Sequence, residues 1–332
     1  MAVFAEIMGK YKVVYTDNIY KDNEIENRRF KEAGYDFKVA SAKDEATLIK
    51  ECQDADAVML SFIEMNKNII DSLKKCKIIV RCGMGFNNVD IPAATKKGIM
   101  VANVQKYCLE EVSDHCIALM LSVIRKTAYL DRLVHQGKWD PAAARPIPRL
   151  STLTFGLYGL GGISSFVAKK AKAFNMHVIS YDKFLPQAHF DELGVERVEK
   201  EEDLFRRADV LSVHLPLNEN TKAIISYDKM KLMKPTAVFL NTARGGLVDE
   251  AGLIKALQEK VIGGAGLDVF VEEYPKMTNP LFHMDNVVCT PHIAYYSDGS
   301  DIDLRNYACD QVIEALEKGE PRFFLNKKEL GR

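Results

Sequence analysis

The sequence has a single tryptophan, almost no net charge and no long uncharged apolar run. Lys and Arg total 45 against 46 for Asp and Glu, so composition gives no electrostatic reason to expect a nucleic-acid partner or binding to an anionic membrane. No stretch approaches the roughly 18 apolar residues of a membrane-spanning helix. The first ten residues lack the apolar core of a secretory signal, so we expect a cytoplasmic protein.

The cysteines follow neither a metal-binding nor a redox pattern. No two are spaced C-x-x-C, and none joins a histidine at the spacing of a zinc site. Several lie in apolar runs, where cysteine behaves as a small hydrophobic residue. We therefore expect no metal site and reduced thiols at all seven positions: Cys52, Cys76, Cys82, Cys108, Cys116, Cys289 and Cys309.

The chain is too long for one ordinary domain, since domains usually hold roughly 100–200 residues. Short apolar runs alternate with helix-forming segments, and this alternation occurs twice, which predicts two parallel sheets covered by helices. The first series has strands at 13–15, 37–39, 57–60 and 78–80, with helices at 24–33, 44–53 and 66–73. The second has strands at 153–158, 178–181, 210–215, 237–240, 265–269 and 287–290.

Two further helices are expected outside these series. One long helix should run from 109 to 135, and the prolines after it predict an irregular segment at 139–150. A last helix at 300–317 should bury Ile302, Val312, Ile313 and Leu316. The fold class is therefore α/β, with two doubly wound parallel-sheet domains.

A glycine-rich loop opens the second series. Gly159-Leu160-Gly161-Gly162-Ile163-Ser164 follows an apolar strand and begins a helical pattern. The first glycine permits a tight turn, the second lets the backbone approach a pyrophosphate, and the helix N-terminus offers free N–H groups. Serine replaces the usual third glycine. Asp182 ends the next strand, where ribose hydroxyls would lie, and its charge favours NAD, although the adjacent Lys183 leaves NADP open.

Polar clusters follow the later strands, at the edge of a doubly wound sheet where ligands bind. They begin at His214, Asn241, Asp268 and Thr290. Reduction of a 2-oxo acid needs a cation for the carboxylate and a proton donor for the C2 oxygen. Arg244 offers a two-pronged fork, and His292 can carry a proton near neutral pH. Glu273 is the expected partner that holds the His292 ring.

With these segments in place, the chain resembles the D-isomer-specific 2-hydroxyacid dehydrogenase family. The matching stretches, in family order, are 81–90, the Gly159 loop, 214–217, 241–249, 264–270 and 290–294. Residues 110–115 and 290–297 look most like the branch that contains phosphoglycerate-dehydrogenase-like enzymes and the C-terminal-binding-protein corepressors.

The resemblance implies a flavodoxin-like substrate domain at 1–105 plus 296–332, a Rossmann NAD-binding domain at 106–295, and a cleft between them. It also implies a homodimer, a D-configured hydroxy acid and Arg244, Glu273 and His292 as the catalytic residues. The substrate-binding residues would be Met84, Gly85, Arg244, His292 and Tyr295, with the turn 83–85 holding the carboxylate. The cofactor-binding residues would be Tyr158, Gly159, Gly161, Gly162, Ile163, Asp182, His214, Pro216, Thr221, Thr242, Ala243, Arg244, Asp268, His292 and Ala294.

The sequence departs from the family pattern at several positions. Gly162 stands where the family often has arginine, and Gln105 where proline is usual. Tyr274 separates Glu273 from Pro275, so either a one-residue bulge keeps Glu273 in its role or Glu272 takes it. Tyr295 either shapes the pocket or packs under the last helix. His115, in a predicted helix, is expected to be structural.

Two other functions fit parts of this pattern. An NAD(H)-sensing corepressor or scaffold would keep the same fold and site, and a phosphoglycerate dehydrogenase would need additional cations for a phosphate. The predicted substrate class is therefore a small 2-oxo or 2-hydroxy acid whose side chain the sequence leaves open.

Overall fold

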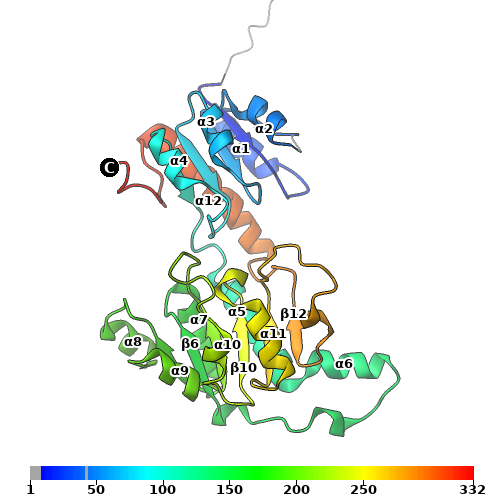
Figure 1. Ribbon diagram of the computed structural model, residues 1–332. Coiled ribbons are helices and arrows are strands. Elements are labelled where there is room, and N and C mark those ends of the chain that lie inside the picture. The colour runs from blue at the N-terminus through cyan, green and yellow to red at the C-terminus, as the bar shows by residue number, and fades with distance from the viewer. Residues whose placement is uncertain (1–8, 42–43) are drawn as a thin grey trace, which may run out of the picture. The chain divides into compact units, whose positions relative to one another are not determined.

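The computed structural model describes residues 9–41 and 44–332. The chain forms two compact units (Figure 1). Unit 1 holds the described residues up to Tyr107 together with Ser297–Arg332, and unit 2 holds Cys108–Tyr296. All strand pairs that form the two sheets are parallel, and helices connect the strands, which confirms the predicted doubly wound α/β class.

The sheet of unit 1 has the order β2-β1-β3-β4-β5, which is the flavodoxin-like order. β3 and β5 are buried along their whole length, as apolar strands covered on both faces should be. The sequence pattern predicted the first four strands and the first three helices of this unit, but it did not predict β5 or α4. The strands are Lys12–Tyr15, Asp36–Val39, Ala57–Leu60, Ile78–Arg81 and Met100–Asn103, and α1 to α4 are Glu24–Glu32, Glu45–Cys52, Lys67–Ser72 and Ile91–Lys96.

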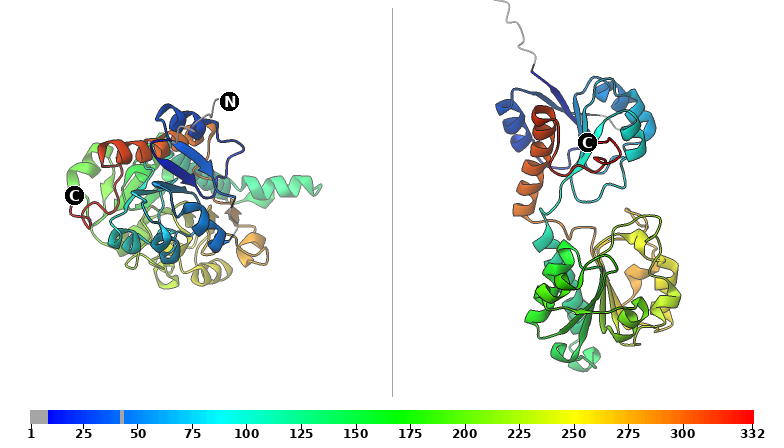
Figure 2. Two further views of the ribbon diagram at one scale, coloured as in Figure 1. Left: turned by 90° about the horizontal axis from the view of Figure 1, so that it is seen from above. Right: turned by 90° about the vertical axis from the view of Figure 1, so that its left-hand side faces the viewer.

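Helix α12 (Asp298–Lys318) returns from the end of the chain to cover this sheet. It packs against β4, β5 and α1, beside which it lies in Figure 2. A capping box between Ser297 and Ser300 starts the helix. The predicted buried face was wrong at Ile302, which is 53% exposed. Arg305 is buried instead, at 8% exposure.

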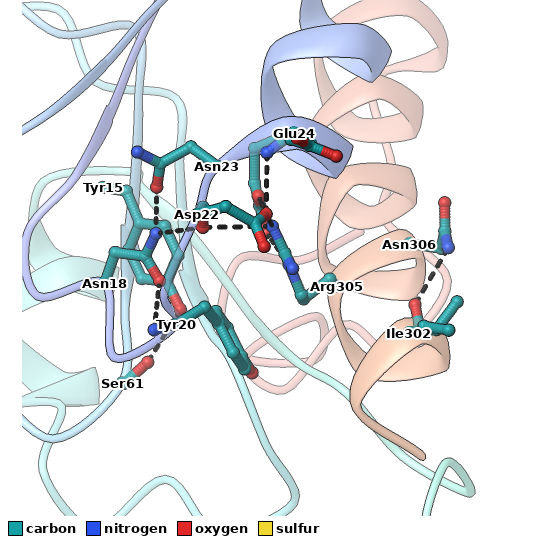
Figure 3. Close-up of polar contacts among 11 residues, drawn as sticks. Tyr15, Asn18, Tyr20, Asp22, Asn23, Glu24, Ser61, Ile302, Arg305 and Asn306 are labelled. Carbon is teal, nitrogen blue, oxygen red and sulfur yellow. Dashed lines mark hydrogen bonds and ion pairs between the residues drawn. The ribbon is translucent and has the colours of Figure 1, made fainter. Parts of the chain in front are cut away.

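An ion pair with Glu26 on α1 explains the buried arginine, whose contact with Asp22 is drawn in Figure 3. Arg305 Nε donates to Glu26 Oε1 at 2.8 Å and Nη2 donates to Oε2 at 2.6 Å. Nη2 also donates to Asp22 Oδ1 at 2.8 Å, and this bond holds the pKa of Asp22 below its usual range. The guanidinium fork thus satisfies a Glu26 side chain that is only 1% exposed.

We expect Arg305→Met to destabilise unit 1 strongly, because Glu26 would be left buried without a partner. The loss should be about 3–5 kcal/mol in the free energy of unfolding by urea. Adding Glu26→Leu to this variant should recover most of the loss, since no charge then remains buried. A single variant that unfolds at the wild-type urea concentration would show that the pair does not stabilise the unit.

The sheet of unit 2 has the order β12-β11-β10-β9-β6-β7-β8, and the strand order reverses between β6 and β9. This is the dinucleotide-binding order with one added strand. The short β8 was not predicted. The strands β6 to β12 are Thr154–Tyr158, His177–Tyr181, Glu196–Arg197, Val210–Val213, Val238–Asn241, Gly264–Leu267 and Val287–Cys289.

Helices pack on both faces of this sheet. Phe239 of β10 belongs to one core, with residues of α9, α10 and α11, whereas its neighbours Val238 and Leu240 belong to the other, with residues of α5 and α7. This alternation follows from the two-residue period of a strand. The helices α7 to α11 are Gly162–Ala173, Gln187–Leu193, Glu201–Arg207, Tyr227–Met230 and Glu250–Gln258.

The single long helix predicted at 109–135 is in fact two. α5 (Leu109–Arg125) ends at Lys126, which has a left-handed backbone (φ 56°), and α6 (Thr127–His135) follows. α6 buries none of its residues and extends away from the sheet of unit 2 (Figure 1). Across residues 9–41 and 44–332, no helix is long and apolar enough to cross a membrane.

Candidate active site

The two glycines of the loop after β6 serve different purposes. Gly159 has φ +93°, and a Cβ there would lie 2.7 Å from the carbonyl oxygen of His214. Gly161 has an ordinary extended backbone, and a Cβ there would meet no atom within 4 Å. The protein's own packing therefore requires glycine at 159 but not at 161. The open space at 161 lies at the N-terminus of α7, where a pyrophosphate would need it.

The N-terminus of α7 suits an anion. Its first turn holds no acidic residue, and no side chain caps it. Ser164, at the third glycine position of the motif, is fully buried, and its hydroxyl donates to the Gly161 carbonyl at 3.1 Å. A small side chain with a satisfied hydroxyl thus fits here, so the departure from glycine leaves the helix packing intact.

Asp182 lies at the end of β7, as predicted, and is bonded to the glycine loop. Its Oδ2 accepts from the Leu160 N–H at 3.0 Å. Its Oδ1 accepts from the N–H groups of Phe184 and Leu185 at 2.9 and 3.3 Å. Because a carboxylate offers about four acceptor positions, capacity remains for a ribose hydroxyl.

His214 follows β9, and its ring is neutral at neutral pH. Burial lowers its pKa to about 4, and its Nε2 lies 2.9 Å from the Ser212 hydroxyl. An imidazole with this pKa carries no proton to donate as an acid near pH 7. His214 therefore stays a predicted cofactor-binding residue and not a proton donor.

Four other expected cofactor residues differ in whether their side chains could contact a bound cofactor. Thr242, at the end of β10, has a buried hydroxyl without a hydrogen-bond partner in the described part of the chain, so this hydroxyl could bond to a cofactor. Thr221 instead closes its own loop by donating to the Pro216 carbonyl at 2.6 Å. The Tyr158 hydroxyl donates to Glu201 in the core, so only its main chain can reach a cofactor. Ile163 is half-buried at the start of α7.

Arg244 follows β10 on a loop that approaches the neighbouring backbone closely. A Cβ at Gly245 would lie 1.9 Å from the Phe270 carbonyl oxygen, so only glycine permits this approach. Asn241 braces the loop by accepting from the Ala243 N–H at 3.0 Å and donating to the Arg244 carbonyl at 2.9 Å. Arg244 itself is half-buried, and its Nη1 donates to the Ala243 carbonyl at 2.6 Å.

His292 and Glu273 are brought together from separate loops. His292 Nδ1 lies 2.5 Å from Glu273 Oε1, which leaves the opposite ring nitrogen, Nε2, for a substrate. Glu273 makes this bond despite the inserted Tyr274, which is 84% exposed. The Tyr295 ring lies edge-on to His292, with the ring centroids 6.3 Å apart. β12, β11 and β10 are neighbours, so His292, Asp268 and Arg244 all follow adjacent strands at one sheet edge.

Asp268 is buried and holds the loop that carries His292. Its Oδ1 accepts from the Thr290 hydroxyl at 2.6 Å and the Ile293 N–H at 3.0 Å, and its Oδ2 accepts from the Ala294 N–H at 3.0 Å. At 1% exposure this carboxylate is mainly occupied by its own loop. The resemblance implied a cofactor-binding role for Asp268, and no motif indicated these bonds to the loop of residues 290–294.

In unit 1, the turn predicted to hold a substrate carboxylate follows β4. Gly83 has φ +143°, and a Cβ there would lie 1.6 Å from Arg81 Nη1. Asn103 fixes the turn by donating to the Met84 carbonyl at 2.6 Å, and the Val104 N–H donates to the Gly83 carbonyl at 3.1 Å. Met84 and Gly85 are half-buried. The turn is therefore rigidly braced at a sheet edge that ligands commonly use.

The fold and the glycine loop of unit 2 define a dinucleotide-binding α/β protein. The family model for the D-isomer specific 2-hydroxyacid dehydrogenase NAD binding domain matches residues 117–294, more than half of the chain. The chain is 33% identical over 312 residues to a glyoxylate reductase of Korarchaeum cryptofilum, with 91% of this chain and 93% of that protein covered. The chain therefore belongs to the D-isomer specific 2-hydroxyacid dehydrogenase family, which confirms the resemblance.

Two further relatives extend this comparison. A D-3-phosphoglycerate dehydrogenase of Methanocaldococcus jannaschii is 38% identical over 310 residues, covering 93% of this chain but only 58% of that longer protein. The crystal structure of D-lactate dehydrogenase from Aquifex aeolicus, complexed with NAD and lactic acid, superimposes with a TM-score of 0.83 at 27% identity. That comparison covers 92% of this chain and 96% of the other.

Replacing Gly161 by alanine should weaken NADH binding without unfolding the protein. The added methyl group meets no protein atom, so we expect urea stability within about 1 kcal/mol of wild type. It would occupy the space beside the α7 N–H groups and raise the Kd for NADH at least about tenfold. Gly159→Ala is the contrasting control, because it should destabilise the fold itself. Wild-type NADH affinity in Gly161→Ala would contradict this placement of the pyrophosphate.

The low pKa of His214 predicts that stability falls as the solution is acidified. Between pH 6.5 and 4 the unfolded chain takes up a proton at this histidine and the folded chain does not, so its contribution is complete above pH 6.5 and lost toward pH 4. The drop in unfolding free energy from pH 7 to 4.5 should be smaller in His214→Gln by about 1–2 kcal/mol, allowing for the partial exposure of the residue. Equal drops in both proteins would contradict a lowered pKa for His214.

Proposed function

We propose that this protein is an NAD-dependent oxidoreductase that interconverts a 2-oxo acid and its D-2-hydroxy acid, acting mainly as a 2-oxo acid reductase. The observation that carries the proposal is the bonded pair of His292 and Glu273 at the same sheet edge as Arg244. A proton donor held by a carboxylate, next to a cation-bearing loop, is what reduction of a 2-oxo acid requires.

Unit 2 is the proposed cofactor-binding domain. The open space at Gly161, the uncapped α7 N-terminus and the unsatisfied Thr242 hydroxyl suit a dinucleotide, and Asp182 favours NAD. When bound, the nicotinamide donates a hydride to a carbonyl carbon or accepts one from an alcohol carbon. The cofactor-binding role that the resemblance implies for Asp268 stays a prediction.

The chain's own residues then have defined tasks. Arg244 binds the substrate carboxylate and polarises the C2 carbonyl. His292 gives its Nε2 proton to the C2 oxygen as negative charge develops there. Glu273 orients the ring through Nδ1, so that Nε2 is left to face the substrate.

We further propose that the protein is a cytoplasmic homodimer. All seven cysteines are free, as expected in a reducing compartment. α6 buries no residue, and Trp139, just beyond it, is 86% exposed. Such an apolar extension suits an interface with a second copy of the chain.

The direct test is NADH oxidation at 340 nm against a panel of 2-oxo acids from glyoxylate to phenylpyruvate, including 3-phosphohydroxypyruvate, repeated with NADPH. We expect turnover of at least one member. Arg244→Ala should lower kcat/KM about 100- to 1000-fold, because an aligned charge is lost in the transition state. His292→Ala should abolish turnover while NADH still binds.

Arg206→Ala is the matched control, since Arg206 lies on the surface of α9, where it pairs with Asp203. It should leave kcat/KM at the wild-type value. Tight NADH binding without turnover of any 2-oxo acid would contradict the proposed reaction and favour a nucleotide-sensing scaffold.

A further inference from the structure

His115 on α5 contacts the loop that carries His292. Its Nε2 lies 2.8 Å from the Thr290 hydroxyl oxygen and 3.6 Å from Asp268 Oδ1. The Thr290 hydroxyl in turn lies 2.6 Å from the same carboxylate oxygen. The side chain of His115 is 23% exposed, so water reaches one end of this row while the other end is buried. Three polar side chains from different elements thus form a continuous chain of hydrogen bonds.

The direction of these bonds follows from what each group can donate. A carboxylate only accepts, so the single hydroxyl hydrogen of Thr290 is donated to Asp268. The Thr290 oxygen must then accept from His115, which places a hydrogen on His115 Nε2. The geometry therefore assigns the tautomer of His115 and makes Thr290 the link between a helix and a buried carboxylate.

Asp268 in turn holds the backbone at His292 and at the two residues that follow it. Its carbonyl accepts from the His292 N–H at 2.8 Å, while its carboxylate accepts from the N–H groups of Ile293 and Ala294. His292 has a left-handed backbone with φ +53°. A non-glycine residue stays in this conformation only when its surroundings hold it there. The orientation of the His292 ring thus depends on a carboxylate that must itself be held in place.

We propose that His115 and Thr290 are positioning residues that act through Asp268 to fix His292 for proton transfer. The inference rests on the proposed function for the role of His292, but the placement of the ring can be tested without turnover. Neither residue needs to touch the substrate. Their effect should be much larger on kcat than on the affinity for NADH, because a displaced proton donor slows the chemical step while the glycine loop at Gly161 is unchanged.

The test compares Thr290→Val, which keeps the shape but removes the hydroxyl, with Thr290→Ser, which keeps the hydroxyl. Thr290→Val should lower kcat about 10- to 100-fold with the Kd for NADH changed less than about twofold. Thr290→Ser should retain kcat within about threefold. His115→Leu should resemble Thr290→Val, and it serves as the second variant if Thr290→Val does not fold. His115→Gln, whose amide can donate, should recover part of the activity.

Long-range proton–nitrogen NMR of the histidine rings gives a readout that does not need activity. In wild type, His115 should show a hydrogen on Nε2. The His292 ring signals should move in Thr290→Val and His115→Leu but not in Thr290→Ser. If the variants that lose the hydrogen bond match wild type in both kcat and His292 signals, the inference is wrong. Equal loss in Thr290→Ser and Thr290→Val also overturns it.

A wild-type protein that reduces no 2-oxo acid would instead contradict the proposed function. In that case the NMR comparison alone still decides whether His115 and Thr290 position His292. Failure of the inference and failure of the proposed function therefore give different results.

Discussion

The candidate chemistry depends on one buried carboxylate. Asp268 accepts two main-chain N–H groups and one hydroxyl, and its carbonyl accepts the N–H of His292. A carboxylate removed from water is tolerated only when hydrogen bonds replace its hydration. The same bonds that satisfy Asp268 hold the loop of residues 290–294, in which His292 has a left-handed backbone. Burial of this carboxylate therefore makes the site rigid.

The parallel sheet brings these groups together. β10, β11 and β12 are neighbours in unit 2, and each ends at the same edge. Arg244, Asp268 and His292 follow these three strands, so residues far apart in the sequence lie at one edge of the sheet. Glycine is needed where two of the connecting loops approach another backbone, at positions 159 and 245. The sheet order and these two glycines account for most of the site's geometry.

Sequence patterns predicted the strands well, since apolar runs, glycine loops and strand-end polar residues are local signals. They failed where a distant partner decides the outcome. Ile302 fits a helical apolar stripe, yet α12 buries Arg305 because Glu26, 279 positions away, pairs with it. The break at Lys126 carries neither glycine nor proline, so nothing local indicated it. The contact of His115 with Thr290 likewise joins segments that only the folded sheet makes adjacent.

The most direct measurement of the central claim is isotope transfer from NADH deuterated at C4 of the nicotinamide to a 2-oxo acid, followed by mass spectrometry and chiral analysis of the product. Each of the two C4-deuterated forms should be supplied separately. One form should deliver a single deuterium to C2 of a D-2-hydroxy acid, and the other should deliver none. A reduced product without deuterium from either form, or no reduced product while NADH remains bound, would contradict direct hydride transfer in this site.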